Sequence, residues 1–547
     1  MPSSEHGNHR PIGRRVTLMG AVLAVVAIAA GLPGLDELGV TWDEPRYFES
    51  AERIERWTAR AASGEWRDAL SAPAIREAWD ADRYYNPHPP AYKAAMAITD
   101  AVFADWLGVP GSYRLSSLLM FGLLAALVGG WTARLTRPAA GVAAGVALLL
   151  MPRVFGHAHV AATDMPLTLF WFVATMGAFF YVREGRRRWI ILAAVALGLG
   201  LATKFTAFLL PVPLAGWMLL QARTRRSVAV CVYGLALAML VAVLANPAAW
   251  PDPIGYQRRL IAESLSREMH VPISTYYFGR VFPFAVPWHH AIAMTGATLP
   301  VGTIALAIIA LKTVIRRGRT RPLATLCVVQ IAFWWGLMAL PDSPNHDGVR
   351  LWLPMFPFVA VMAGIGFGIL VGAMTRWTGA ARVSAGELAV PLLLGALYFT
   401  PAFLGTVRAF PYYLSYYGEL VGGASGAARW GFEATYWLDA VTASFRKEVD
   451  RTLPRGARVV AHPNAEYYTQ LQDLGLIRSD LRFTQAPPAD YLLLLGRKAM
   501  LERGWEAVYR SARPLLATEL DGVELVGLYT WTDRETGVGD NATGETP

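Results

Sequence analysis

Residues 40–48 read VTWDEPRYF and follow the first long apolar segment of the chain. Two adjacent carboxylates, Asp43 and Glu44, therefore stand where a membrane helix would end and water would begin. Charged groups at such a boundary are costly to keep next to hydrocarbon and are typically retained for a function. We interpret this acidic turn as the point around which the other helices of the chain are arranged.

The composition is that of a membrane protein. Of 547 residues, 54% are hydrophobic and only 17% are charged, and the mean hydropathy is +0.33, which is too apolar for a soluble chain of this length. The net charge of +9 comes from short arginine-rich bursts between apolar runs. Such bursts mark cytoplasmic loops, so we expect no nucleic-acid partner. The two cysteines lie inside apolar segments and predict packing roles.

Apolar runs of about 20 residues predict a polytopic α-helical protein with about eleven spans. The predicted spans are 16–35, 113–131, 141–155, 165–182, two short helices within 189–221 that meet near Lys204, 228–245, 289–315, 323–340, 351–374 and 387–407. With this topology the tail 1–15 and every arginine burst are cytoplasmic. The first span resembles a signal peptide, but no small-residue cleavage site follows it, so we expect it to be retained.

The segments outside the spans have their own pattern. Within the transmembrane unit 16–407, the long segments 36–112 and 246–288 are predicted to be external, with helices at 47–62, 72–82 and 88–107, the last along the membrane interface. Residues 408–534 predict an interface segment and a small extracytoplasmic α/β domain with helices 436–452 and 497–511 and strands 457–462, 490–495 and 523–531. The tail 535–547 is predicted to be disordered.

Polar side chains near the predicted membrane boundaries gather on the external side. A proton or ion pathway would distribute acids through the middle of the bilayer, whereas a one-sided cluster suits chemistry on a lipid head group. No internal repeat is found in the sequence, which argues against a transporter built from inverted repeats.

An ordered set of segments resembles family 39 of the GT-C glycosyltransferases, a group that includes protein O-mannosyltransferases and the aminoarabinose transferases that modify lipid A. The segments are TWDEPRYF (41–48), NPHPPAYK (86–93), YRLSS (113–117), HAHVAATDMPLTLFW (157–171), GLATKFTAFLLP (200–211) and HDGVRLWLPMFPFVAVMAGIG (346–366). The resemblance covers roughly residues 12–435, and the set is more specific than any one motif.

The resemblance implies the GT-C fold in the plasma membrane and a polyprenyl-phosphate sugar as donor. The sugar would pass to a hydroxyl of a protein, lipid or glycan acceptor on the extracytoplasmic face. The resemblance also implies that Asp43, with Glu44 beside it, is the catalytic centre, because a carboxylate in hydrogen-bond reach can take the proton of the acceptor hydroxyl. The alternative interpretation is that Asp43 caps the next helix, with Pro45 in its first turn.

The leaving lipid phosphate requires positive charge at the head-group level. The candidates are Arg350, Lys204, Arg114 and Lys93. Arg350 is the first choice because VRLWLP is similar to the family's Arg-Tyr-Leu-x-Pro pattern, although the residues after the arginine depart from it. The alternative for Lys204 is a snorkelling lysine at a helix end.

Further residues are expected to support the substrate site, namely Asp164, His88, His157, His159 and His346. Asp164 has an alternative role as a helix N-cap, with Pro166 following. His157 and His159 are two residues apart and do not share a helical face, so they predict no zinc site. Asp43 with Asp164 could hold a divalent cation, but no DxD pair favours one, and we expect no cofactor.

A second function stays open at this point, that of a transporter or flippase of lipid-linked saccharides. The C-terminal domain has no catalytic set of residues of its own in the sequence, and is expected either to hold the acceptor or to cover the site.

Overall fold

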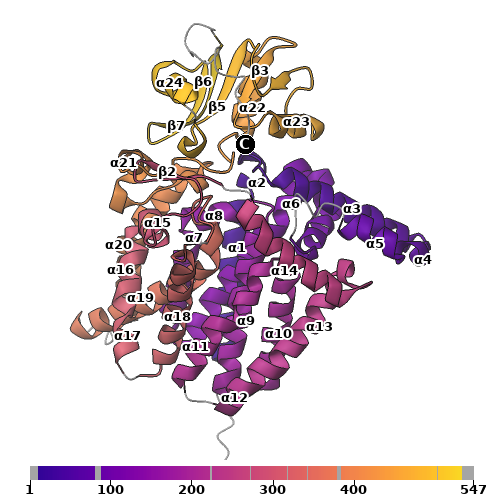
Figure 1. Cartoon of the computed structure of the whole chain (residues 1–547). Helices are drawn as coiled ribbons and strands as arrows, with labels where there is room; N and C mark the ends of the chain where they lie inside the picture. The colour runs from indigo at the N-terminus through magenta and orange to yellow at the C-terminus, as the bar shows by residue number, and fades with distance from the viewer. Residues whose placement is uncertain are drawn as a thin grey trace, which may run out of the picture.

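The computed structural model describes residues 10–80, 88–221, 224–270, 273–316, 318–341, 343–378, 384–501 and 503–531. A bundle of apolar helices lies below a smaller α/β domain, and a helical arm projects sideways at the level between them (Figure 1). The tail 535–547 and Asn86 of the second motif lie outside the described residues.

Seven segments of the described chain are long and apolar enough to cross a membrane. They are α1 (Arg10–Gly31), α6 (Ala91–Leu135), α9 (Asp164–Glu184), the run of α12 (Thr224–Ala229), the π-helical turn η2 (Val230–Gly234) and α13 (Leu235–Leu244), α18 (Arg321–Met338), η4 with α19 (Arg350–Met355, Phe356–Thr378), and α20 (Ser384–Ala409). An eighth arises if α15 (His290–Thr298) and the strongly bent run of α16 (Val301–Ala310) and α17 (Lys312–Ile315) form one broken span.

The other predicted spans coincide with shorter helices, namely α7 (Pro138–Leu149), α10 (Arg187–Leu201), η1 (Phe205–Leu209) and α11 (Pro211–Gln221). Each predicted span therefore overlaps a helix of the described residues. Only seven or eight of the segments, rather than about eleven, pass the length and composition test for crossing a membrane.

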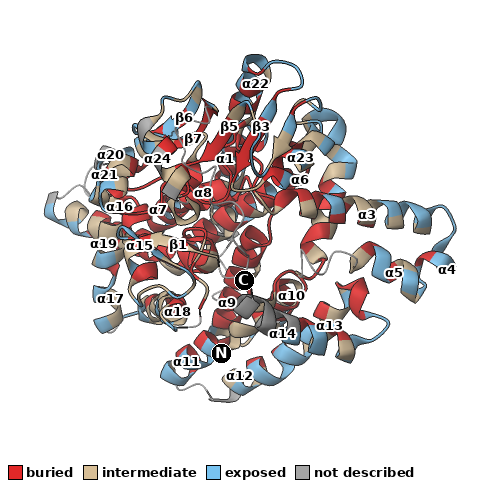
Figure 2. Cartoon of the chain, turned by 45° about the horizontal axis from the view of Figure 1, so that its top comes forward, coloured by how far each residue is buried: buried red, intermediate tan, exposed pale blue. Residues whose placement is uncertain are grey.

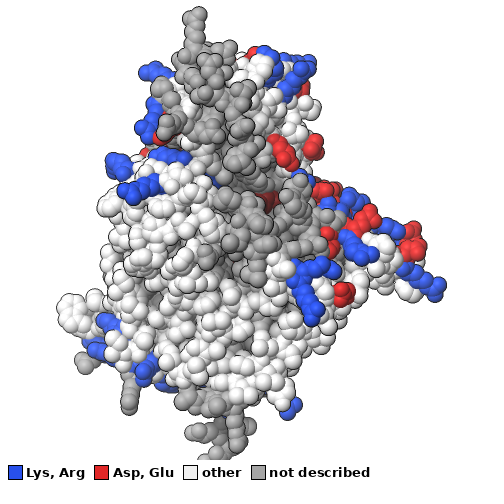
Figure 3. All heavy atoms as spheres, in the orientation of Figure 1, with Lys and Arg blue, Asp and Glu red and all other residues white. Residues whose placement is uncertain are grey.

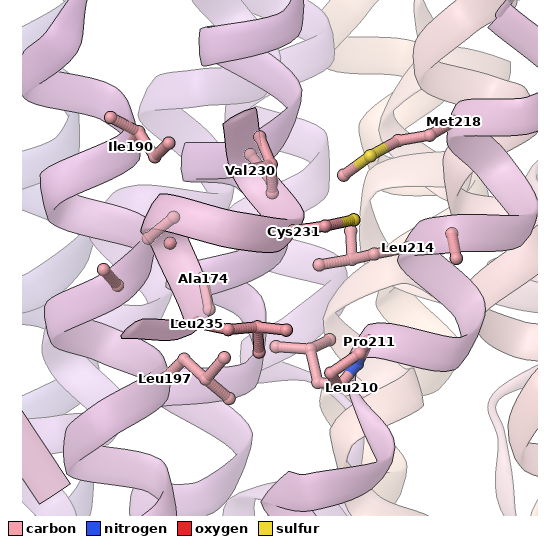
Figure 4. A pocket seen from close by; sticks show the side chains of 15 residues that line it. Ala174, Ile190, Leu197, Leu210, Pro211, Leu214, Met218, Val230, Cys231 and Leu235 are labelled. Atoms are coloured by element: carbon pink, nitrogen blue, oxygen red, sulfur yellow. The ribbon is translucent and has the colours of Figure 1, made fainter. Parts of the chain in front are cut away.

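Burial separates the central helices from the peripheral ones. The helices α9 and α19 are buried almost all round, whereas α1, α13 and α20 are mostly exposed, as expected of helices that face lipid. Seen from the top, buried residues are concentrated in the interior and exposed ones at the periphery, as on the arm of α3, α4 and α5 (Figure 2). A crevice between α9, α10, α11 and η2 is lined by apolar side chains such as Leu197, Leu214, Met218 and Val230 (Figure 4). It carries no charged side chain among its lining residues.

The helical arm after the first span matches the predicted helices 47–62 and 72–82 closely within the described residues. It consists of α3 (Glu44–Ala62), α4 (Trp66–Ala69) and α5 (Ala72–Trp79), and a short α2 (Gly34–Glu37) precedes it. The predicted interfacial helix 88–107 and the second span are the two parts of α6, interrupted at Gly108 and Val109, whose backbone is not helical. Pro110 follows the break, and Gly108 has a φ of +62°, a conformation that favours glycine.

The segment 246–288 and the segment that follows α20 consist mainly of short elements. They are η3 (Pro247–Ala249), α14 (Pro253–His270), the antiparallel hairpin of β1 (Thr275–Tyr277) and β2 (Arg280–Phe282), η6 (Tyr413–Ser415), η7 (Glu419–Val421) and α21 (Gly423–Arg429). Between α7 and α9 lies the short helix α8 (Pro152–His157).

The C-terminal α/β domain contains a five-stranded sheet in the order β4-β3-β5-β7-β6. Its strands are β3 (Arg458–His462), β4 (Arg482–Thr484), β5 (Tyr491–Leu495), β6 (Leu516–Leu520) and β7 (Val523–Thr530). The pairs of β3 with β4 and with β5 are parallel, and β7 is antiparallel to both its neighbours. The three predicted strands are confirmed as β3, β5 and β7. The helices are α22 (Ala443–Thr452), α23 (Ala465–Asp473), η8 (Lys498–Met500) and α24 (Arg503–Ser511).

Two predicted helices of this domain are partly wrong. The helix predicted for 436–452 begins only at Ala443, because Thr442 caps it by accepting a hydrogen bond from Phe445 N at 3.2 Å and because Leu438 has a φ of +68°. The helix predicted for 497–511 is divided into η8 and α24, since Leu501 has an extended backbone.

Candidate active site

The acidic turn is held against the C-terminal part of the chain by its backbone. Gly39 N donates to Asp439 O at 2.9 Å and Trp42 N donates to Trp437 O at 3.2 Å. A Cβ on Gly39 would lie 2.5 Å from Asp439 O, so this close approach requires glycine. The hydroxyl of Tyr467 on α23 donates to Val40 O. The C-terminal domain therefore helps to fix the position of Asp43.

Glu44 is a structural carboxylate, which contradicts its prediction as a catalytic residue. Its side chain is fully buried, and both oxygens accept two hydrogen bonds each. Arg114 donates to them from Nε and Nη2 at 2.7 Å, while Thr41 N and Ala161 N donate at 2.7 and 2.8 Å. A carboxylate saturated in this way is not available to take a proton from a substrate.

Arg114, predicted as a candidate for the donor phosphate, is engaged in structural contacts instead. Beyond Glu44, its guanidinium donates to the carbonyl oxygens of Leu35, Leu38 and Gly39 at 2.7–2.9 Å, and its side chain is fully buried. These bonds use all five N–H groups of the side chain. Arg114 thus fastens the chain between α1 and α3 to the start of the second part of α6.

Asp43 occupies the N-cap position of α3 without capping it. Its side chain makes no hydrogen bond to the backbone of the helix, which contradicts the alternative role as a cap. Instead its Oδ2 accepts from Nη2 of Arg350 at 3.0 Å. The Asp43 side chain is 38% exposed, whereas that of Arg350 is 9% exposed. Asp43 thus presents a carboxylate to water while it is held by a buried cation.

Arg350 stands at the first residue of η4 and joins three carboxylates. Its Nε donates to Asp164 at 3.1 Å, its Nη1 to Asp347 at 3.0 Å and its Nη2 to Asp43 at 3.0 Å. Its guanidinium carbon lies 3.9 Å from the centre of the Trp437 ring, a cation–π contact that further fixes the fork. The three acidic partners come from the N-terminus of α3, the start of α9 and the loop before η4.

Lys204 lies where the sequence predicts it, between two short helices, α10 and η1. Its Nζ donates to Oδ1 of Asp164 at 2.7 Å, and the Lys204 and Asp164 side chains are only 6% and 3% exposed. Lys204 is therefore a buried ion-pair partner, which contradicts the snorkelling alternative. Asp164 bridges Lys204 and Arg350 at the start of α9, and its N-cap role is also contradicted, because Thr163 holds that position.

Two members of the cluster were absent from the predicted site. Asp347 bonds to Arg350 through Oδ2, and its Oδ1 lies 3.3 Å from Nη1 of Arg497, which follows β5 in the C-terminal domain. Asp347 stands three residues before Arg350 in the motif HDGVR, so the sequence contains a signal that could identify it as a site residue. Arg497 carries no local signal, since only the fold brings it to the site. We refer to Asp43, Asp164, Lys204, Asp347, Arg350 and Arg497 as the charged cluster.

Burial and neighbouring charges shift the two carboxylates of the cluster that lie outside the spans in opposite directions. Desolvation raises the pKa of Asp43 above its ordinary value, an effect that Arg350 opposes and that the carboxylates of Asp347 and Asp164 reinforce. Desolvation would also raise the pKa of Asp347, but Arg497, His346 and Arg350 together lower it. Asp43 is thus the better proton acceptor of the two.

Three of the predicted histidines lie around the cluster and are held neutral. Burial lowers the pKa of His157 and of His346 to about 4, and burial with the charge of Lys204 lowers that of His88. The His88 ring stacks on Phe205, and the His346 ring nitrogen Nε2 lies 3.9 Å from Asp347. These neutral rings can donate or accept one hydrogen bond to a polar substrate without adding charge.

The two other predicted residues differ in their placement. Both ring nitrogens of His159 lie within hydrogen-bond distance of backbone carbonyl oxygens, those of Phe155 at 2.8 Å and Gly31 at 2.9 Å, so its ring serves the packing of the chain. Lys93 is buried in the first turn of α6, and its charge contributes to lowering the pKa of His88. Lys93 therefore remains, like Lys204, a candidate for binding the donor phosphate.

The arrangement does not fit a divalent cation between Asp43 and Asp164. Arg350 donates to both carboxylates and so already occupies the position that a bridging cation would need. Among the described residues there is also no group of three or more His, Cys, Asp or Glu side chains with the spacing of a metal site.

The comparisons with known proteins agree with this architecture. Residues 87–250 match the family model of dolichyl-phosphate-mannose-protein mannosyltransferases. The structure of apo ArnT from Cupriavidus metallidurans matches with a TM-score of 0.51 and 15% identity, covering 93% of this chain and 97% of that one. ArnT bound to undecaprenyl phosphate matches with a TM-score of 0.49 and 14% identity, covering 94% and 98%.

A structure of the Archaeoglobus fulgidus oligosaccharyltransferase tethered to an acceptor peptide matches with a TM-score of 0.48 and 12% identity, covering 88% of this chain and 65% of that one. None of the curated proteins matches the sequence at a significant level. Asp164 and Lys204 lie inside the residues matched by the family model, and Asp43 and Arg350 lie outside them. The chain is thus a multi-pass membrane protein with the GT-C glycosyltransferase fold, and its residues 87–250 are similar to the family model of the dolichyl-phosphate-mannose-protein mannosyltransferases.

Proposed function

We propose that this protein transfers a hexose or pentose from a polyprenyl-phosphate donor to an acceptor hydroxyl on the extracytoplasmic face of the plasma membrane, with Asp43 as the general base. The observation that carries the proposal is the geometry of Asp43, a partly exposed carboxylate held at 3.0 Å by the buried Arg350 within a cluster of cations and carboxylates. The fold and the family match support transferase chemistry on a lipid-linked sugar.

In this reaction the acceptor oxygen forms a bond to the anomeric carbon as the bond from that carbon to the phosphate oxygen breaks. The proton of the acceptor hydroxyl passes to Asp43, and the electron pair of the broken bond stays on the polyprenyl phosphate. The raised pKa of Asp43 brings its basicity closer to that needed near neutral pH. Arg350 keeps the carboxylate in one orientation, so that proton transfer needs no reorganisation of the base.

The leaving phosphate would be received by Lys204, Arg350 and Lys93. Lys204 donates one N–H to Asp164, and Arg350 donates one N–H from each of its nitrogens to a carboxylate. Both side chains therefore retain further N–H groups that can donate to phosphate oxygens. Within the described cluster, three carboxylates face Lys204, Arg350 and Arg497. Lys93, buried in the first turn of α6, adds further positive charge to this side of the site.

The extracytoplasmic location is supported by the distribution of charge. On the face shown in Figure 3, Asp and Glu gather at the upper end, around the arm and the C-terminal domain, whereas the lower end of the bundle carries only Lys and Arg. An excess of basic residues marks the cytoplasmic side. The charged cluster belongs to the opposite, upper end, where α3 and the C-terminal domain meet.

The proposal is tested with the full-length protein in lipid nanodiscs. Undecaprenyl-phosphate-linked mannose, glucose and arabinose are offered one at a time, with host membrane lipids and water as acceptors, and released undecaprenyl phosphate is measured by mass spectrometry. We expect release with at least one donor, and a loss of at least about 100-fold in Asp43→Asn, because a general base contributes roughly 10²–10⁴-fold to the rate. Release of undecaprenyl phosphate by Asp43→Asn at the wild-type rate would contradict the assignment of Asp43 as the general base.

The same variant separates this function from lipid transport. A flippase moves the intact donor across a vesicle membrane without releasing undecaprenyl phosphate. In vesicles with a fluorescent lipid-linked sugar, we expect the wild-type protein to leave the rate of transbilayer movement at that of empty vesicles. Transport of the intact donor that survives in Asp43→Asn would favour the flippase.

A further inference from the structure

Arg497 belongs to the C-terminal domain and still reaches the charged cluster. It follows β5, and its side chain is only 5% exposed. Its Nη1 donates to Tyr436 O at 2.6 Å and lies 3.3 Å from Oδ1 of Asp347. The other oxygen of Asp347 accepts from Arg350 at 3.0 Å, and Arg350 in turn donates to Asp43. Two arginines from different parts of the chain therefore share one carboxylate.

The backbone around Arg497 is fixed by a second buried residue, Glu433. The two oxygens of Glu433 accept from Lys498 N at 2.7 Å and from Ala499 N at 2.8 Å. These are the first amides of η8, and the Glu433 carboxylate satisfies them in place of a helical partner. The residues after Arg497 are thus tied to the interface segment, which leaves its guanidinium little freedom to move away from Asp347.

The loop that carries Asp347 is equally constrained. Asp347 has a φ of +57° and Gly348 a φ of +67°, in the left-handed region that few residues adopt without support. A Cβ on Gly348 would lie 2.6 Å from Nη1 of Arg153, so the loop is packed tightly against α8. A strained loop of this kind is held in place by the contacts at its end, and the contact between Asp347 and Arg497 is one of them.

We propose that Arg497 is a positioning residue of the transferase site. Through Asp347 and Arg350, the C-terminal domain sets the orientation and the local charge of Asp43. This inference rests on the proposed function for its catalytic meaning, since Asp43 is there the base. The domain is therefore an integral part of the site.

The electrostatic consequence has a defined sign. The charged and titratable groups that act on Asp43 are Arg350 from η4, Asp347 from the preceding loop, Asp164 from α9 and Tyr47 from α3. Arg497 neutralises Asp347. Without Arg497, the charge of Asp347 is opposed by Arg350 but no longer by a second arginine, so it acts more strongly on Asp43 and makes its ionisation harder. Loss of the Arg497 charge is thus expected to raise the pH at which Asp43 ionises.

This prediction can be tested without any turnover. A water-soluble carbodiimide with an amine nucleophile modifies protonated carboxyl groups, and the partly exposed Asp43 is followed by peptide mass spectrometry as a function of pH. Arg497→Gln removes the charge and retains a donor for Tyr436 O. We expect its half-labelling pH at Asp43 to rise by roughly half a unit to one unit. Arg497→Lys keeps the charge and should restore most of the wild-type profile.

Arg458→Gln is the matched control, because Arg458 lies in the same domain but pairs with Asp490 at the surface. It should leave the profile unchanged. Asp347→Asn should lower the half-labelling pH of Asp43, and Arg497→Gln should have no further effect on that background. An unchanged profile in Arg497→Gln, or an equal shift with and without Asp347, would overturn the inference.

If Arg497→Gln does not fold, the test uses Asp347→Asn. An unchanged half-labelling pH of Asp43 in that variant refutes the proposed connection from Arg497 through Asp347 to Asp43. These readouts are independent of transfer, so a catalytically active Asp43→Asn would reject the proposed function while the labelling still decides the inference.

Discussion

Arg114 holds both carboxylate oxygens of Glu44, with Nε donating to Oε1 and Nη2 to Oε2 at 2.7 Å each. Both side chains are fully buried. The two neighbouring acids of the turn thus differ in their surroundings, because both oxygens of Glu44 are engaged in the fold whereas the carboxylate of Asp43, the proposed base, is partly exposed. A buried ion pair of this kind is costly to break by removing one partner.

We therefore predict that Glu44→Ala and Arg114→Ala each destabilise the protein by about 3–5 kcal/mol, since each leaves an uncompensated charge in the interior. Thermal unfolding of the purified protein in detergent measures the effect. Asp43→Asn should unfold close to the wild-type temperature, because the Asp43 side chain is partly exposed. Equal destabilisation by the changes at positions 43 and 44 would contradict this division of roles.

The pH dependence of transfer should follow Asp43. A general base must be ionised, so kcat/KM falls as the pH drops through the pKa of Asp43. Burial raises that pKa above the usual 3.8, so the fall should begin at a higher pH than for an exposed carboxylate. The measurement is kcat/KM between pH 4 and 8. An acid limb that ends at or below the ordinary aspartate value would show that Asp43 does not control it.

Lys204 should contribute to donor binding. Lys204→Met removes a cation from beside Asp164 and should weaken the binding of undecaprenyl phosphate at least about tenfold, because one charge-assisted phosphate contact is worth roughly 1.5–3 kcal/mol. Native mass spectrometry with undecaprenyl phosphate as the probe gives the affinity. Lys312→Met is the control, because Lys312 is exposed on α17. An equal loss of affinity for undecaprenyl phosphate in both variants would indicate nonspecific electrostatic attraction.

Glu433 should make the stability of the C-terminal domain depend on pH. Burial raises the pKa of Glu433 to about 7, against an ordinary value of 4.5, although its two backbone amide partners and Arg497 oppose the shift. The folded state therefore keeps a proton that the unfolded chain releases. The stabilisation that this proton gives is complete below about pH 4.5 and is lost as the pH rises through about 7.

Between these values, we expect the free energy of unfolding to fall by up to about 1.4 kcal/mol per pH unit from this residue. Glu433→Gln should flatten that part of the slope, whereas Glu448→Gln, at an exposed position of α22, should not. Hydrogen exchange of β3 and β5 between pH 5 and 7.5 reports the change. An unaltered slope in Glu433→Gln would exclude Glu433 as its source.

The topology predicts opposite labelling at the two ends of the bundle. In a Cys231→Ser background, Trp288→Cys before α15 should react with a membrane-impermeant maleimide in intact cells, and Ile315→Cys on α17 should react only after permeabilisation. Both positions are exposed, at 65% and 83%, and Cys327 is buried. Reaction of Ile315→Cys alone in intact cells would reverse the proposed orientation.

The sequence allowed much of the fold and part of the site to be predicted. Arginine bursts and apolar lengths located the spans, and alternation located β3, β5 and β7, because both signals are local. Contacts between residues that are far apart in the sequence leave no such local signal. The neighbours Asp43 and Glu44 look equivalent in the sequence, and only the position of Arg114 on α6 distinguishes them.

Arg497 illustrates the same limit from the other end of the chain. It resembles any surface arginine after a strand, and it becomes part of the site only because Glu433 and Tyr436 hold the segment in place. Similarly, the helix predicted from residue 436 fails because residues 437–439 pair with the acidic turn instead of continuing the periodic pattern.

The backbone pairing of Gly39 with Asp439 joins the beginning of the polypeptide to a stretch that the ribosome makes some hundreds of residues later. Asp43 emerges early in biosynthesis, but Trp437, which contacts its partner Arg350, and Arg497, which contacts Asp347, follow the last membrane helix in the sequence. A nascent chain stalled before that stage therefore lacks Trp437 and Arg497, so the charged cluster around Asp43 is completed only near the end of synthesis.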